Sequence, residues 1–276
     1  MKYIKKERIS GIGQTEREFL SKLLRATKIT ISVSEAANIL GLKQDQAAKI
    51  LARYNKKGWL KRIQQGVYLP VPITSLTSDI VAEDPFVIAE KLFSPCYIGG
   101  TNAANYWDLT EQIFRTTTIM TQKMVRNRKS KIAGNEYLIH TLKPLYFFGL
   151  KTVWLNDIKI KISDPTRTIV DMLMFPSFCG GLNFIIEVLQ NYYRSQYKDM
   201  DLLINYLETA KNGAAIKRFG FLVDIYFPNE KKVIDYCLKN LTQGYVKLSP
   251  SLDCSKLIRR WRLWVPKNWK RKFYDK

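Results

Sequence analysis

One stretch near the N-terminus contains two short helical patterns, a glycine between them and a hairpin directly after the second helix. The first pattern, Ser34 to Leu42, contains Gly41 near its end, which favours a helix stop. The second runs from Gln44 to Lys57, and Gln65-Gly66 then predicts a tight turn inside a hairpin over Lys61 to Leu69. This order predicts a helix-turn-helix followed by a β-wing, a shape that fits the major groove of DNA.

The second helix of this stretch divides into two faces. Ala47, Ile50, Leu51 and Tyr54 fall on one face, which we expect to pack against the first two helices. The other face carries Gln and cations with no acidic member. Side chains near the helix start are expected to reach base edges, and those further along to contact phosphates. The expected DNA contacts of helix and wing are Lys43, Gln44, Gln46, Lys49, Arg53, Lys56, Lys57, Lys61, Arg62 and Gln64.

Two other interpretations of this stretch stay open. A basic helix face is often merely solvated, and a winged helix can instead contact a protein. The charge of the whole chain favours a polyanionic partner, because it is +21. Residues 1–72 hold 15 basic and 5 acidic side chains, and residues 255–276 hold 9 basic and 1 acidic. The charge therefore lies at the two ends of the chain.

Cations outside the N-terminal stretch form a possible second basic patch. One group, from Lys123 to Lys129, lies beside a strand expected at 115–121. The simpler interpretation of this group is an exposed loop. In the other group, Arg260 and Arg262 alternate with tryptophans. Such a tail could stack on bases, or be an edge strand that buries Trp261. The residues of the possible patch are Lys123, Arg126, Arg128, Lys129, Arg260 and Arg262.

The length of 276 residues allows about two domains of roughly 100–200 residues. We predict an α+β protein: a winged helix-turn-helix domain over residues 1–75, with a basic arm at 1–14, and a larger mixed α/β domain over 76–276 with a basic, Trp-rich tail. Further strands are expected at 137–141, 151–162 and 257–265. Helices are expected at 15–27, 85–93, 102–109, from 165, and at 183–193, 200–211, 214–225 and 231–240.

Catalytic chemistry finds little support in the sequence. The four cysteines are far apart, and the single His140 cannot complete a zinc site, so we expect no metal and no cofactor. Gly99-Gly100-Thr101-Asn102 is a helix cap rather than a phosphate loop, since it lacks the lysine of such loops. Arg167 and Asp171 form an ordinary i, i+4 pair. The sequence shows no signal peptide and no membrane span, so we expect a cytoplasmic protein. Because the familiar catalytic motifs are missing, we also expect that it is not an enzyme.

Several motifs follow one another in a fixed order along the chain. They are Lys56-Lys57-Gly58-Trp59-Leu60, Gly66-Val67-Tyr68, Ile98 to Thr110, Asp164 to Asp171, Phe178-Cys179-Gly180-Gly181 and Lys217-Arg218-Phe219-Gly220-Phe221. This order resembles the AbiEi-type antitoxins of bacterial type IV toxin–antitoxin systems, which act in abortive infection. One clear departure is Lys43, where a Ser or Thr helix cap is more usual.

The resemblance implies an autoregulating transcriptional repressor whose winged domain binds double-stranded promoter DNA of its own operon. It also implies a C-terminal domain that counteracts a nucleotidyltransferase-like toxin, in many members without a lasting complex. Two alternatives stay open. One is a stand-alone winged-helix regulator with a ligand-sensing C-terminal domain. The less favoured one is a metal-dependent nuclease, which would need clustered carboxylates.

Overall fold

The structure is a computed structural model that describes residues 13–26, 30–71, 84–155, 158–267 and 269. It mixes helices and sheets, so the expected α+β class is confirmed. The chain divides into two compact units. The N-terminal unit extends to Leu92 and includes Ser130–Glu136, and the C-terminal unit holds Phe93–Lys129 and the chain from Tyr137. The domain boundary expected at residue 75 and most of the expected basic arm lie outside the described residues.

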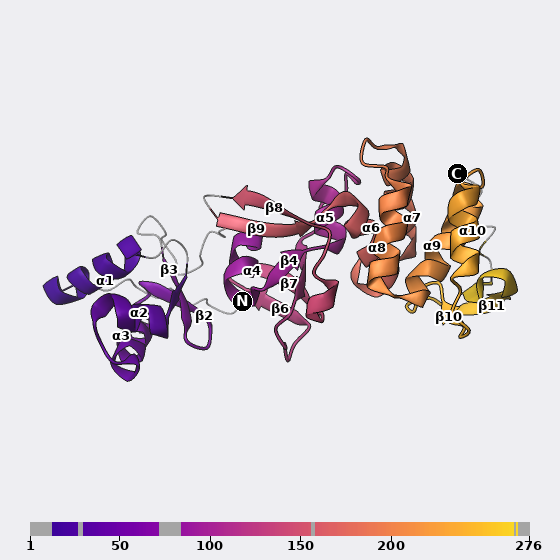
Figure 1. Cartoon of the computed structure of the whole chain (residues 1–276). Helices are drawn as coiled ribbons and strands as arrows, with labels where there is room; N and C mark the ends of the chain where they lie inside the picture. Colours follow the sequence, from indigo (N-terminus) through magenta and orange to yellow (C-terminus); the bar gives the residue numbers. More distant parts are fainter. Residues whose placement is uncertain (1–12, 27–29, 72–83, 156–157, 268, 270–276) are drawn as a thin grey trace. The chain divides into compact units, whose positions relative to one another are not determined.

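In the described part of the N-terminal unit, helices and a small sheet come before the last helix (Figure 1). Two of its strands form the expected hairpin. The third, β1, was not predicted, because a strand of two residues has no periodicity to detect. The sheet order is β1-β3-β2, and both pairings are antiparallel. The elements are α1 (Gln14–Ala26), β1 (Ile31–Ser32), α2 (Val33–Leu40), α3 (Gln44–Lys56), β2 (Leu60–Gln64), β3 (Val67–Pro70) and α4 (Pro85–Phe93).

Local signals fix both ends of α2. Ser32 Oγ accepts from Glu35 N at 3.1 Å, and Glu35 Oε2 accepts from Ser32 N at 2.8 Å. This capping box satisfies donors that the first turn leaves unpaired. At the other end, Gly41 has a φ of +67°, a left-handed conformation that glycine adopts without strain. The chain therefore leaves α2 in a tight turn, and α3 starts three residues later.

The core of this unit lies between its helices and its sheet. The apolar positions of α3 recur at helical spacing, so one whole face of that helix is buried. The Tyr54 and Trp59 rings lie 5.2 Å apart and join the end of α3 to the start of β2. Other members of this core are Leu20, Leu23, Ile31, Ala36, Ala37, Ala47, Leu51, Leu60 and Tyr68.

A six-stranded sheet has the order β6-β7-β5-β4-β9-β8. Its β4 is parallel to β9 and antiparallel to β5, whereas β8 and β9 form an antiparallel hairpin. Helix α5 (Gly100–Tyr106) follows β4 directly, with Gly99 as its cap residue, so Gly99-Gly100 belongs to a helix start. The strands are β4 (Cys96–Ile98), β5 (Thr116–Thr121), β6 (Lys129–Ile132), β7 (Asn135–Thr141), β8 (Leu150–Leu155) and β9 (Ile158–Ser163).

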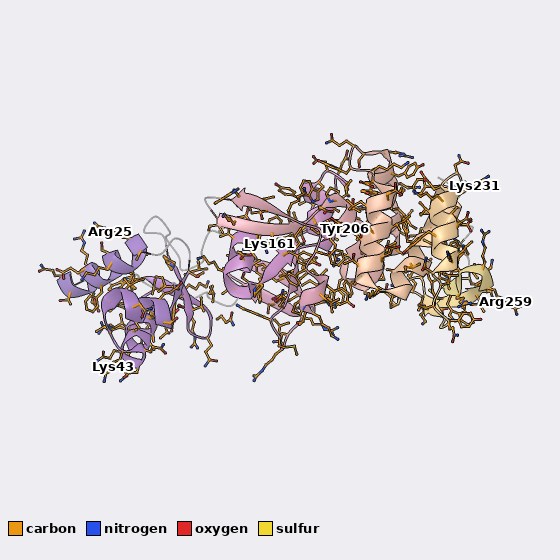
Figure 2. All side chains as sticks on the ribbon, viewed as in Figure 1. Arg25, Lys43, Lys161, Tyr206, Lys231 and Arg259 are labelled. Carbon is orange, nitrogen blue, oxygen red and sulfur yellow. The ribbon has the colours of Figure 1, made fainter. Side chains whose placement is uncertain are left out.

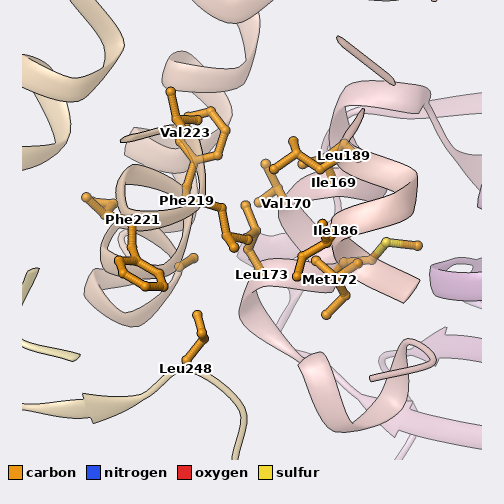
Figure 3. Close-up of a cluster of buried hydrophobic side chains, with 14 of the residues drawn as sticks. Ile169, Val170, Met172, Leu173, Ile186, Leu189, Phe219, Phe221, Val223 and Leu248 are labelled. Atoms are coloured by element: carbon orange, nitrogen blue, oxygen red, sulfur yellow. The ribbon is translucent and has the colours of Figure 1, made fainter. Parts of the chain in front are cut away.

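The helices of the C-terminal unit pack around α6, every residue of which is buried. Asp164 caps α6 by accepting from Arg167 N at 2.7 Å, and Pro165 is its first residue, as predicted. Figure 3 shows Leu173 of α6 beside Phe219 of α9. The elements are α6 (Pro165–Met174), α7 (Leu182–Arg194), α8 (Met200–Ala210), α9 (Gly213–Tyr226) and α10 (Lys231–Lys239), with short 3₁₀ turns η1 (Pro144–Tyr146) and η2 (Pro176–Phe178).

The prediction of one strand over 257–265 is wrong. The chain forms β11 (Cys254–Ile258), a 3₁₀ turn η3 (Arg259–Trp261) and β12 (Leu263–Pro266), which pairs back onto β11. The reversal needs Arg262 in a left-handed conformation with a φ of +52°, and its Nη1 donates to the Thr242 carbonyl at 2.9 Å. An arginine gives no turn signal in the sequence. With β10 (Val246–Lys247) the sheet order is β10-β12-β11.

Candidate nucleic-acid interface

The start of α3 lies where the sequence predicts it, with Lys43 as the cap residue in an extended conformation. The missing Ser or Thr cap is replaced from within the helix, because Lys43 N donates to Gln46 Oε1 at 3.2 Å. Gln46 therefore uses its amide oxygen to satisfy the helix start. Its amide NH₂ group stays available as a donor to a base edge.

Helix α3 presents two faces of different character. Ala47, Leu51 and Tyr54 are fully buried in the unit's core, as expected. The other side is exposed, which places most of the expected contacts in solvent. The exposed expected contacts on or beside α3 are Lys43, Gln44, Gln46, Lys49, Arg53 and Lys56. Figure 2 labels Lys43 at an outer edge of the unit.

The series of polar and basic side chains that starts at Gln46 has no acidic member, as expected, but an acidic side chain lies next to it. Asp45 is exposed in the first turn of α3 and lies four residues before Lys49. Asp45 is not a member of the series that starts at Gln46. At ~100° per residue, however, Asp45 and Lys49 lie only about 40° apart around the helix axis. A carboxylate in the first turn also interacts favourably with the helix dipole. The continuous cationic strip is therefore narrower and runs through Lys49, Arg53 and Lys56.

Lys57, an expected phosphate contact, is occupied inside the unit. Its Nζ lies 2.6 Å from Glu16 Oε2 and 2.8 Å from Oε1, and 4.6 Å from the centroid of the Trp59 ring. The hydrogen bond from Lys57 lowers the pKa of Glu16. Arg53 Nε also lies 3.4 Å from Glu16 Oε1, but its side chain stays 54% exposed. Lys57 therefore anchors α1 to the end of α3, whereas Arg53 still faces solvent.

Three exposed lysines on or beside α3 have no carboxylate partner among the described residues. Lys43, Lys49 and Lys56 form no ion pair with any residue that the structure describes. They occupy the start, the middle and the last turn of the helix. A phosphate could therefore bind each of them without displacing a carboxylate.

The hairpin after α3 is short, and its turn is fixed to α2. Gly66 has a φ of +75°, and its carbonyl accepts from Val33 N at 2.9 Å. Arg62 N donates to Asn55 Oδ1 at 2.7 Å, which holds β2 against the end of α3. Of the expected wing contacts, Arg62 and Gln64 are exposed and Lys61 is half-buried. The hairpin thus extends the exposed surface of α3.

The possible second basic patch separates into two places. Lys123, Arg126 and Arg128 are exposed between β5 and β6, and Lys129 is exposed at the start of β6. The Arg128 guanidinium lies 5.8 Å from the Phe178 ring. Figure 1 shows β7, next to this group, and β11 on opposite sides of helices α6 to α9. The structure therefore does not bring this group together with the cations of the tail.

The two tail cations are engaged by their own unit. Arg260 Nη1 lies 3.6 Å from Asp224 Oδ2, and Arg262 is half-buried with Nη1 bonded to the Thr242 carbonyl. Trp261 is 1% exposed, and its Nε1 donates to Asp224 Oδ2 at 2.9 Å. Of the two interpretations of the tail, the structure confirms the burial of Trp261, so this ring cannot stack on a base.

The i, i+4 pair of α6 is more than ordinary helix support, which the sequence did not reveal. Arg167 Nη2 lies 2.8 Å from Asp171 Oδ1, and both side chains are fully buried. Tyr97 donates to Asp171 Oδ2 at 3.0 Å. Burial raises the pKa of Asp171, and the charge of Arg167 opposes that rise. The guanidinium carbon lies 4.1 Å from the Phe148 ring centroid, so a ring face covers this cation.

The two cations of the motif over 217–221, Lys217 and Arg218, have structural roles in α9. Lys217 is fully buried and donates to the Gly244 carbonyl, and burial lowers its pKa. Arg218 Nη1 donates to the Leu173 carbonyl at 2.7 Å, and its Nη2 donates to the Lys247 carbonyl at 3.0 Å. Both hold the segment before and within β10 against α9. Their role is structural, and neither can bind an external anion.

Within the described ranges, no three His, Cys, Asp or Glu side chains gather to hold a metal ion. The carboxylates expected of a metal-dependent nuclease are therefore not clustered in that part of the chain. No helix built from the described residues has the length and apolar character to cross a membrane.

Comparisons with known proteins bear on the fold alone. No protein-family model matches the chain, and no curated protein matches it in sequence. Among solved structures, the chain is similar to the crystal structure of the RV2827C protein from Mycobacterium tuberculosis. The TM-score is 0.60 with 13% sequence identity, and the match covers 94% of each chain. The two proteins thus share a fold over nearly their whole length.

Proposed function

We propose that the protein is an AbiEi-type antitoxin and transcriptional repressor whose N-terminal unit is a winged helix-turn-helix domain. One observation carries the DNA-binding part. The exposed face of α3 presents Lys43, Lys49 and Lys56 without a carboxylate partner among the described residues. The tight turn at Gly41 before α3 and the hairpin after it fit a recognition helix followed by a wing.

In the proposed mechanism α3 enters the major groove of promoter DNA. Gln44, Gln46 and Lys49 read base edges from the first turns of the helix. Arg53 and Lys56 bind phosphates near its end, and exposed side chains of the hairpin add backbone contacts. Lys57 takes a different role from the one expected, because its bond to Glu16 fixes the end of α3. The basic residues of the wing in this mechanism are Lys61 and Arg62, with Gln64 beside them.

The antitoxin part of the proposal rests on the resemblance of the motifs across both units. The C-terminal unit would counteract a nucleotidyltransferase-like toxin in the cytoplasm, without catalysing a reaction itself. Four of the motifs lie in that unit: at the start of α5, at the capped start of α6, in the turn before α7 and at the cations of α9. No residue of the C-terminal unit is assigned to toxin neutralisation.

The DNA-binding part is tested by measuring the affinity of the full chain for the DNA upstream of its own gene. Lys49→Ala should weaken specific binding by about 5- to 150-fold, the range for one base contact. Lys56→Ala should weaken binding to all sequences and lower the salt slope by about one. Lys231→Ala removes an exposed lysine of α10 and is the matched control. Unchanged affinity in both α3 variants would overturn the assignment of α3.

The antitoxin part needs a separate test. Co-expression of the full chain with the product of a neighbouring nucleotidyltransferase-like gene should restore growth that the toxin alone arrests. Lys49→Ala and Lys56→Ala should still restore growth from a foreign promoter, because they alter only the proposed DNA contacts. A toxin whose effect persists at equal expression of the protein would contradict the antitoxin assignment and leave the DNA-binding assignment intact.

A further inference from the structure

The outer face of the β8–β9 hairpin carries an exposed tryptophan among lysines. Trp154 is 61% exposed, whereas each of the other five tryptophans of the chain is buried or half-buried. Burial of the large apolar surface of an indole ring is favourable, so a partner that covers Trp154 would gain this stabilisation. Figure 1 shows β8 and β9 side by side, and β8 is an edge strand of the six-stranded sheet.

The register of the hairpin decides which side chains share this face. Trp154 is paired with Lys159, and Thr152 with Lys161, so all four lie on one side of the two strands. Figure 2 labels Lys161 on this hairpin. The opposite side holds Ile160 at 1% and Ile162 at 0% exposure. The alternation of lysine and isoleucine along β9 therefore produces one apolar face for the core and one cationic face for solvent.

No ion pair among the described residues neutralises the lysines on this face. Lys159 Nζ lies 5.1 Å from the Trp154 ring centroid, a cation–π contact. Neither Lys159 nor Lys161 forms an ion pair with a described residue, and both strands lack acidic side chains. Asp157 lies between the two strands in the sequence and is outside the described residues. The face thus combines an aromatic ring with two lysines that have no carboxylate partner among the described residues.

We propose that this face binds single-stranded nucleic acid. An unpaired base can stack on the Trp154 ring while Lys159 and Lys161 neutralise the adjoining phosphates, the combination that single-strand binding surfaces use. A duplex fits less well, because its bases are already stacked on one another and offer no open face to the ring. An acidic protein segment would use the lysines and leave the ring in water. The ligand and the unit both differ from those of the proposed promoter binding.

The test uses the full chain with Lys49→Gln, Arg53→Gln and Lys56→Gln, which removes charge from α3. A labelled single-stranded 12-mer of mixed sequence, as DNA and as RNA, is the probe for fluorescence anisotropy. We expect Trp154→Ala to weaken binding by about 5- to 150-fold, the range for loss of one stacked base. Lys159→Gln with Lys161→Gln should lower the salt slope by about 1.4, at about 0.7 for each phosphate of a single strand.

Tyr245→Ala is the matched control, because this ring is 57% exposed at another place in the same unit. It should leave the affinity unchanged, and Trp154→Phe should retain most of it. Three results would overturn the proposal: unchanged affinity in Trp154→Ala, a duplex of the same sequence bound equally well through Trp154, or polyglutamate displacing the probe in a Trp154-dependent way. Trp154 is exposed, so its replacement does not endanger folding.

Discussion

The Glu16 carboxylate binds Lys57 through both of its oxygens, with Nζ 2.6 Å from Oε2 and 2.8 Å from Oε1. The two residues lie 41 positions apart in the sequence and join α1 to the end of α3. The same carboxylate lies 3.4 Å from Arg53 Nε. One acidic side chain therefore fixes the orientation of the proposed recognition helix and offsets positive charge at its C-terminal end.

We expect Glu16→Gln to tighten binding to DNA at low salt. The substitution keeps the shape of the side chain but frees Lys57 and Arg53 from a carboxylate, so phosphates can replace it. The salt slope should become steeper by about one for each cation that gains a phosphate. The measurement is a salt series of fluorescence anisotropy on a duplex. Glu18→Gln removes the same charge from an exposed position of α1 and should change the slope less. A shallower slope in Glu16→Gln would contradict this role.

The same ion pair predicts a pH dependence of stability. The hydrogen bond from Lys57 lowers the pKa of Glu16 below its ordinary value of 4.5. Because the folded pKa is lower than the unfolded one, the contribution is fully present above pH 4.5 and is lost as the pH falls through the folded pKa. Urea denaturation should show Glu16→Gln less stable than the natural protein at pH 7, with the difference shrinking in acid. A constant difference down to pH 3 would contradict the ion pair.

Elements of the fold with local sequence signals, such as helix caps and turns, could be predicted. Short strands without such signals could not. Asp164-Pro165 and Gly41 mark helix ends through a side-chain cap and a left-handed turn, and the structure has both. Strand β4 was missed, because Cys96–Ile98 is a run of three buried residues with no alternation. β6 was missed within an expected loop. Its four residues contain two lysines and do not read as a strand.

The candidate site was predictable to the extent that it follows helix periodicity. The buried and exposed sides of α3 agree with the spacing of Ala47, Leu51 and Tyr54. Lys57 was assigned to the DNA surface because it falls beside Arg53 on the helix. Its carboxylate partner comes from α1, and periodicity within one helix carries no information about tertiary neighbours. The same limit explains why the spacing of Arg167 and Asp171 predicts only an ordinary i, i+4 pair and not a buried one.

Gly220 of α9 is expected to tolerate no side chain. A Cβ at this position would run into the Trp261 ring and would lie 2.7 Å from Cys237 Cβ. The ring cannot swing away, because it is buried and its Nε1 is bonded to Asp224. Gly220→Ala should therefore destabilise the protein by about 3 kcal/mol or more, the upper part of the range for overpacking. Thermal and urea denaturation would measure the loss.

The control for this substitution is Gly244→Ala, since a Cβ there meets nothing within 4 Å. It should change stability by less than about 1 kcal/mol. The double variant Gly220→Ala with Trp261→Leu removes the clash and should lose less stability than the sum of the two single variants. Strict additivity would show that Gly220 acts through something other than the indole ring.

The buried pair Arg167 and Asp171 of α6 leads to a prediction that tests whether the fold needs their charges. Arg167→Met leaves the buried Asp171 carboxylate with Tyr97 as its remaining partner, and breaking one side of such a pair costs about 3–5 kcal/mol. Replacing both members by apolar residues removes both buried charges. It also removes the Nε and Nη1 donors of Arg167, which are buried without a hydrogen-bond partner. Arg167→Met with Asp171→Leu should therefore be more stable than Arg167→Met alone. Urea denaturation of the full chain compares the two, and binding to promoter DNA should be unchanged in the double variant. A double variant as unstable as the single one would mean that the fold needs the charges themselves, and the pair would then be a candidate for a role beyond packing.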